Sequence, residues 1–231
     1  LQNVAKEATH AEPAFAHPLP EGGEADWALR WFTPVAEVAM CGHATLASGH
    51  VLMSGDAVRF RTRKAGILAV AHDGDRLLLD LPQILVQPAR HDALLEALGT
   101  PDGEVHLSHE GAEATAIVLL ADAAAVRRCS PDMKALAKID LMAIVTARAE
   151  PGSGHDVVSP VFVPAWGVDE DPLTGSAHAA LTPFWAERLA RESFTAFQAS
   201  RRGGTVDCRL AGGRVVLAGR CVTVIEGVMR L

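Results

Sequence analysis

One order of motifs occurs twice along this chain of 231 residues, and it constrains the fold more than any other feature of the sequence. In each copy, a Phe-x-Pro segment ends a strand-like stretch. A short loop then leads to a glycine that opens a run of small residues, and a second strand-like stretch follows with a Phe six positions before a Gly. The first copy occupies 31–34, 41–44 and 60–66, and the second occupies 161–164, 174–177 and 197–203. The shared order and spacing favour an ancient duplication over the alternative, two unrelated β segments with similar turns.

Hydrophobic periodicity and turn residues predict short strands through most of the first half. The Asp-Gly-Asp sequence at 73–75 is a hairpin signal between two of these strands. Helices are expected over 43–53 and 92–98 because apolar residues share one face and a glycine follows each. The predicted fold class is therefore α+β, with two similar β-rich domains at 1–108 and 109–231 and the last strand packing back on the first domain.

Composition excludes several classes of function. The formal net charge of −7 would repel a nucleic acid backbone. The longest stretch without a charged side chain, 38–55, contains histidines, glycines and serines, so we expect no membrane span. Four cysteines without CxxC spacing read as reduced thiols, and no apolar leader precedes the first strand, so we expect a cytoplasmic protein.

The two glycines that open the small-residue segments, Gly42 and Gly175, are candidate substrate-binding positions. The first N–H groups of a helix have no partner inside the helix, and a glycine lets a ligand approach them closely. If the two helix starts face each other, the cleft between the domains offers two sets of donors, including the Ser176 amide and hydroxyl, to a carboxylate or an enolate-like oxygen. Helix capping alone is the plainer alternative.

Two carboxylates are candidates for acid–base chemistry. Asp171 lies just before a proline and five residues before Ser176, which would hold it at the mouth of the same anion site. Glu12 lies between a helix end and a strand with alanine and proline as neighbours, an apolar setting that suits a general base. Spacing alone ranks Glu12 no higher than an exposed acid.

Two other chemistries are weaker alternatives. A zinc site would use Cys41 and His43 together with His50 or His178, but no second pair has zinc-finger or HExxH spacing, so we expect no metal ligands. Serine hydrolysis would use Ser176, but the G-x-S-x-G nucleophile elbow lacks its second glycine here.

Several long motifs, in the same order and over nearly the whole chain, resemble the PhzF-like isomerase family, the relatives of the phenazine biosynthesis isomerase. A more distant similarity is to diaminopimelate epimerase. The motifs that carry the resemblance lie at 12–15, 30–34, 41–47, 170–178 and 198–204. The resemblance implies two β-roll or barrel domains, each around a central helix, with the active site between them. It further implies a homodimer and a reaction without a cofactor.

The resemblance also assigns roles to residues. Glu12 matches the glutamate that moves the proton, His43 and Asp171 match polar groups that assist it in the cleft, and Gly42, Gly175 and Ser176 match positions that hold the substrate. Cys41 aligns with one catalytic cysteine of diaminopimelate epimerase, whereas Thr174 replaces the other. The implied reaction is therefore proton transfer by Glu12 on a small carboxylic acid, giving an isomer, rather than a two-cysteine racemisation.

Three departures from the family motivate an alternative function. The usual Ser-Glu-Thr is Ala-Glu-Pro at 11–13, the usual Ser-Arg is Ser-Pro at 159–160, and the strand with Gly-Asn-Pro that normally begins the first domain is not found. A catalytically silent small-molecule-binding or scaffold protein of the same fold is the alternative to an active isomerase.

Overall fold

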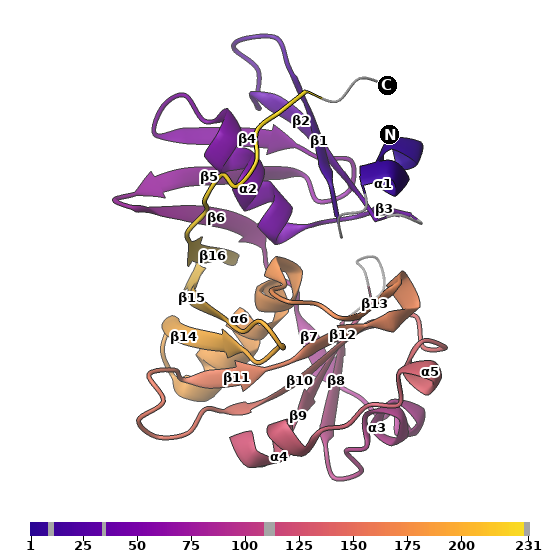
Figure 1. Cartoon of the computed structure of the whole chain (residues 1–231). Helices are drawn as coiled ribbons and strands as arrows, with labels where there is room; N and C mark the ends of the chain where they lie inside the picture. The colour runs from indigo at the N-terminus through magenta and orange to yellow at the C-terminus, as the bar shows by residue number, and fades with distance from the viewer. Residues whose placement is uncertain (9–11, 34–35, 109–113, 229–231) are drawn as a thin grey trace.

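The structure, a computed structural model, describes residues 1–8, 12–33, 36–108 and 114–228. The described part of residues 1–82 contains two helices and six strands, arranged as the upper unit of Figure 1. In chain order these are α1 (Gln2–Ala8), β1 (Ala14–Pro18), β2 (Trp27–Phe32), β3 (Glu37–Val38), α2 (Gly42–Leu52), β4 (Ala57–Arg61), β5 (Ile67–Asp73) and β6 (Arg76–Pro82).

The lower unit of Figure 1 contains the longer helix α6 and most of the remaining elements. In chain order they are β7 (Val86–Pro88), α3 (Asp92–Leu98), β8 (Glu104–Ser108), β9 (Thr115–Leu119), α4 (Ala123–Arg128), α5 (Met133–Leu136), β10 (Met142–Arg148), β11 (Val157–Ser159), β12 (Val161–Val163), the 3-10 turn η1 (Pro164–Trp166), β13 (Val168–Glu170), α6 (Gly175–Leu189), β14 (Ser193–Gln198), β15 (Gly204–Ala211) and β16 (Arg214–Gly219).

The two copies of the sequence repeat fold in the same way. In the first copy β2 pairs with β4 in parallel, and in the second β11 pairs with β14 in parallel. A parallel pair needs a long crossover connection, and a helix lies in each one, α2 in the first copy and α6 in the second. An antiparallel meander follows each helix, β4–β5–β6 and β14–β15–β16. The predicted α+β fold of two similar β-roll units around central helices is confirmed.

Strand pairing divides the chain differently from the predicted boundary at residue 108. β7 pairs with β8, and β8 with β9, so residues 86–108 belong with the sheet of the second half. The apolar run in β9 is buried on both faces and therefore needs a neighbour on each edge, which β8 and β10 supply. By strand pairing, the division falls between Pro82 and Val86.

Several contacts join the units, and two of them are backbone hydrogen-bonded pairings close to the connecting segment. β16 pairs antiparallel with β6, and Arg214 Nε donates to Asp80 Oδ1 at 2.7 Å beside this pairing. The second contact comes from Pro183, which lies inside α6 and has no N–H to donate to the carbonyl of Ala179. The Ile84 amide donates to that carbonyl instead, at 3.0 Å. The segment between the two units is therefore hydrogen-bonded to the central helix of the second.

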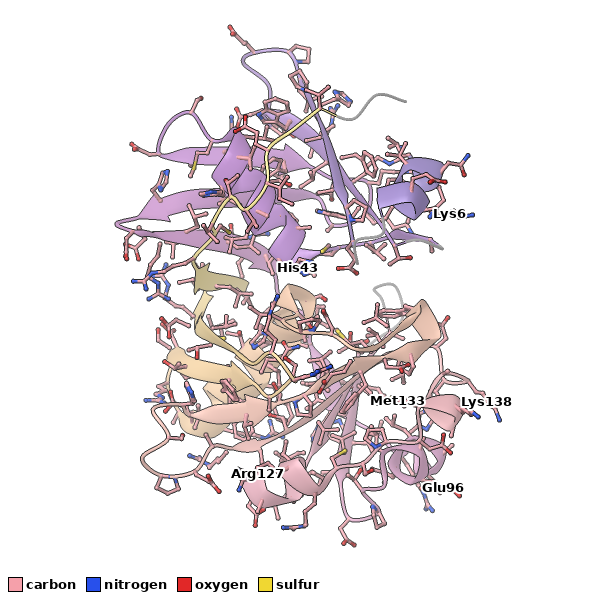
Figure 2. All side chains as sticks on the ribbon, viewed as in Figure 1. Lys6, His43, Glu96, Arg127, Met133 and Lys138 are labelled. Carbon is pink, nitrogen blue, oxygen red and sulfur yellow. The ribbon has the colours of Figure 1, made fainter. Side chains whose placement is uncertain are left out.

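Both central helices begin at the boundary between the units, where Figure 2 shows His43. A Cβ atom placed on Gly42 would lie 2.5 Å from the Gly175 Cα, and one placed on Gly175 would lie 2.6 Å from the Gly42 Cα. The two backbones are thus in direct contact at positions where a side chain has no room. The helix starts predicted from the two glycines are confirmed, and they face each other.

His178, in the second turn of α6, is fully buried. Its Nδ1 lies 2.7 Å from the Thr174 carbonyl oxygen and therefore carries the proton that it donates, while Nε2 has no partner among the described residues. Burial lowers the pKa of His178 because a charged imidazolium would lose its hydration there. The folded protein thus holds this histidine neutral.

No helix among the described residues has both the length and the apolar composition needed to cross a bilayer.

We expect Gly42→Ala and Gly175→Ala each to lower the free energy of unfolding by about 1–3 kcal/mol, because the new methyl group overlaps the opposing backbone. Urea denaturation followed by circular dichroism measures the effect. Gly55→Ala is the control, since open space surrounds that position and the change should be close to neutral. Wild-type stability in both helix-start variants would contradict the contact.

We also expect acid to destabilise the fold through His178. The unfolded chain protonates this residue below its ordinary pKa of 6.5, whereas the folded protein resists protonation, so the unfolding free energy falls as pH drops below about 6.5, by up to roughly 1.4 kcal/mol per pH unit. Between about pH 7.5 and 5.5, the unfolding free energy of His178→Gln should fall less steeply than that of wild type. His72→Gln, a change at an exposed histidine, is the control and should behave like wild type. His106, whose pKa burial also lowers, contributes equally in all three proteins. Identical slopes would rule out His178 as a source.

Candidate active site

Glu12, Cys41 and His43 form a cluster beside the start of α2. Glu12 lies in the turn before β1, and Cys41 is the residue that precedes the helix. The Cys41 thiol donates to Glu12 Oε2 at 2.9 Å, and His43 Nε2 lies 3.6 Å from the same oxygen. The Glu12 and His43 side chains are partly exposed, at 24% and 39%, whereas Cys41 is buried. One carboxylate oxygen is therefore held between a thiol and an imidazole.

Burial raises the pKa of the Cys41 thiol well above its usual range, and the negative charge of Glu12 and the hydrogen bond to it act in the same direction. The Ala44 amide, which acts on the sulfur from the helix start, opposes them. The thiol is therefore protonated at neutral pH and acts toward Glu12 as a hydrogen-bond donor. A thiol in this state is a poor nucleophile.

Asp171 is held by a second cluster, at the start of α6. Its Oδ2 accepts a hydrogen bond from Thr174 Oγ1 at 2.5 Å. Gln198, which is fully buried, donates through Nε2 to the Asp171 carbonyl oxygen at 2.7 Å and to Thr174 Oγ1 at 3.0 Å. Gln198 Oε1 accepts from the Thr174 amide at 2.8 Å. A single glutamine from β14 thus fixes the whole turn that leads into α6.

The two clusters share one small cavity of about 30 Å³. Residues from both helix starts line it, and Ser176 is 7% exposed there with its hydroxyl 3.9 Å from Met142 Sδ. Among the described residues, none accepts a hydrogen bond from the backbone amide of His43 or Ser176. These amides remain available for an anion, as the unpaired N–H groups of a helix start are in general.

A larger cavity of about 200 Å³ lies on the other side of the Gly42–Gly175 contact. Leucines and glycines make up much of its wall, and the polar side chains there are His43, Thr174, His178, Thr205 and Arg220. Glu12, Cys41, Asp171 and Ser176 do not line it. The smaller cavity is the candidate active site because it brings together the ionisable groups and the helix-start amides.

All six residues singled out from the sequence line this smaller cavity: Glu12, Gly42, His43, Asp171, Gly175 and Ser176. Their juxtaposition agrees with the expected placement, and the catalytic and binding roles assigned to them stay predictions. Sequence reasoning missed the Cys41–Glu12 hydrogen bond, the bridging role of Gln198, and Trp166, which lines the cavity while its Nε1 donates to Asp140 at 2.8 Å. Only Cys41 had a local signal, its position two residues before His43.

Comparison with known proteins agrees with this architecture. The family model described as phenazine biosynthesis-like protein matches residues 1–227. An uncharacterized isomerase of Pseudomonas aeruginosa is 46% identical over all of this chain and 87% of its own length. The crystal structure of a PhzF-family phenazine biosynthesis protein from Enterococcus faecalis superposes with a TM-score of 0.81 at 36% identity, over 95% of this chain and 82% of that one.

A hydroxyproline epimerase from Agrobacterium vitis shares the fold at 18% identity and a TM-score of 0.58, over 90% of this chain and 72% of that one. The family match over nearly the whole chain, the identity to named isomerases and the two facing helix starts lead to one assignment. The chain belongs to the phenazine biosynthesis-like, or PhzF, family of isomerases.

Proposed function

We propose that this protein is a cofactor-independent isomerase that moves a proton between two carbons of a small carboxylic acid, with Glu12 as the general base. The observation that carries the proposal is the position of Glu12 in one cavity with the starts of α2 and α6. Such a reaction has two requirements. It needs a base within reach of a substrate carbon, and it needs hydrogen-bond donors for the negative charge that develops.

In the proposed mechanism, the substrate carboxylate binds to the backbone amides at His43 and Ser176. Glu12 takes a proton from the adjacent carbon, so a C–H bond breaks and the electron pair moves into the conjugated system and the carboxylate. Glu12 then returns the proton at a second carbon, which gives the isomer. Donors aimed at the developing charge contribute about 3–4 kcal/mol each in comparable sites, and a positioned acid–base group contributes about 10²–10⁴-fold.

The polar neighbours of Glu12 support this role. The Cys41 thiol and the His43 ring both approach Oε2, so the carboxylate is held in one orientation toward the cavity. Asp171 is turned toward Thr174 and fixed by Gln198 at the opposite helix start. Asp171 and His43 are the proposed orienting groups or proton donors, and Ser176 adds a hydroxyl to the anion site.

The size of the cavity sets a further requirement. A space of about 30 Å³ holds water but no carboxylic acid of several carbons. In the proposal, the substrate enters after the two units move apart at the Gly42–Gly175 contact. Closing would bring both sets of amides onto the substrate and exclude water from the reacting carbon.

Solvent-exchange NMR tests the proposal. Incubation in D₂O with a panel of unsaturated and amino carboxylic acids should give deuterium uptake at one carbon of the substrate. Glu12→Gln removes the base and should reduce uptake by about 10²–10⁴-fold. Glu7→Gln, the same change on an exposed residue of α1, should have no effect. Undiminished uptake by Glu12→Gln would remove Glu12 from the mechanism.

The same panel of acids distinguishes an active isomerase from a catalytically silent binding protein. The Ala-Glu-Pro and Ser-Pro departures from the family motivate that alternative. Binding of a carboxylic acid without any deuterium uptake by the wild-type protein would favour that alternative. The homodimer and the cytoplasmic location stay predictions.

A further inference from the structure

We propose that Glu12, Cys41 and His43 form a binding site for a thiophilic divalent cation of the Zn²⁺ type, which blocks the active site when it is occupied. The candidate ligand atoms are the Glu12 carboxylate oxygen, the Cys41 sulfur and a ring nitrogen of His43. All of them lie within 4.8 Å of one another. Carboxylate, thiolate and imidazole are the three ligand types that Zn²⁺ binds in proteins.

The spacing of the three atoms is close to one face of a zinc tetrahedron. Bond lengths of about 2.0–2.3 Å to oxygen, nitrogen and sulfur require ligand–ligand distances of roughly 3.3–3.6 Å. The observed distances are 2.9 Å from sulfur to Glu12 Oε2, 3.6 Å from that oxygen to His43 Nε2, and 3.7 Å from sulfur to His43 Nε2. An ion therefore fits after the sulfur and the carboxylate separate by about 0.6 Å.

One side chain must turn. The two His43 ring nitrogens are both 3.7 Å from the sulfur, so the ring turns neither nitrogen preferentially toward it. A rotation of the ring directs a nitrogen lone pair at the ion. The His43 side chain is 39% exposed, so it has the freedom to rotate and gives the ion a path from solvent to the buried sulfur.

The charges also fit. On binding, Cys41 loses its proton to solvent and its sulfur bonds to the ion, so thiolate and carboxylate together balance two positive charges. Asp171, whose negative charge also acts on Cys41, adds to the negative potential of the cavity. The cavity leaves the fourth coordination position to water.

This ligand set differs from the zinc site that sequence spacing offered, in which Cys41 and His43 were joined by His50 or His178. His50 Nε2 lies 3.1 Å from Thr223 Oγ1 on the outer side of α2, and His178 is bonded to Thr174 inside α6. The third ligand is instead Glu12, which lies 29 residues before Cys41. No local spacing rule connects these two positions.

The cation is a competitor of the reaction rather than a cofactor. It would occupy the Glu12 oxygen that takes the proton, and it would turn His43 away from its place beside that oxygen. The inhibition rests on the proposed function, whereas the binding does not.

Titration of the purified full chain with Co²⁺ tests the binding without any activity assay. A thiolate ligand gives Co²⁺ a charge-transfer band in the near ultraviolet, and tetrahedral coordination gives strong visible bands. We expect these bands to saturate at one ion per chain and to disappear when Zn²⁺ is added. Cys41→Ser should abolish the charge-transfer band, and His43→Gln should weaken binding by at least roughly tenfold.

Cys221→Ser is the matched control, because Cys221 is a free cysteine outside the cluster, and its titration should match wild type. His43→Gln keeps the test valid if Cys41→Ser does not fold, since His43 is half-exposed. Absence of a thiolate band in wild type, or its persistence in Cys41→Ser, would overturn the site.

Deuterium uptake separates this proposal from the proposed function. If the cobalt absorption bands form but no metal-free sample takes up deuterium into a substrate, the metal site is supported and the isomerase proposal is refuted. Uptake in the metal-free protein that Zn²⁺ does not reduce, although the bands form, would refute the blocking role.

Discussion

The structure depends on the contact between the backbones of Gly42 and Gly175. Any side chain at either position would overlap the opposing Cα, so the two central helices meet only because both begin with glycine. This contact fixes the distance between the units and leaves both sets of helix-start amides at the edge of one cavity. The same residues therefore determine how the units pack and where the proposed anion site lies.

Other contacts between the units support the Gly42–Gly175 contact. The β6–β16 pairing makes one continuous sheet of the two units, and the Ile84 amide uses the Ala179 carbonyl that Pro183 cannot use. A proline inside a helix normally costs stability because it leaves a carbonyl without a partner. Here a residue of the connecting segment satisfies that carbonyl. Both contacts therefore lie close to the segment that connects the units, between β6 and β7.

The repeat, the central helices and the two glycines that open them could be predicted because each has a local signal, whereas Glu12 and His43 were selected by the family resemblance rather than by spacing. Gly42 and Gly175 open small-residue segments, and the hairpin at 73–75 carries its turn residues in adjacent positions. The membership of residues 86–108 could not be predicted, since β7 is three residues long and its partner β8 belongs with β9. The Cys41–Glu12 contact joins residues 29 positions apart across a turn, which periodicity does not describe.

The Glu12 cluster carries two opposed chemical possibilities because its thiol is protonated. As a neutral donor, Cys41 orients the Glu12 carboxylate and adds no charge beside it. If Cys41 loses its proton, two negative charges would lie about 3 Å apart with a third from Asp171 nearby, which is unfavourable unless a cation neutralises them. Burial therefore keeps the thiol protonated, as the proposed proton transfer requires, and only an ion that binds sulfur strongly would overcome this barrier. Hard cations such as Mg²⁺ would not, because they prefer oxygen ligands, so the proposed site would discriminate between the two kinds of metal.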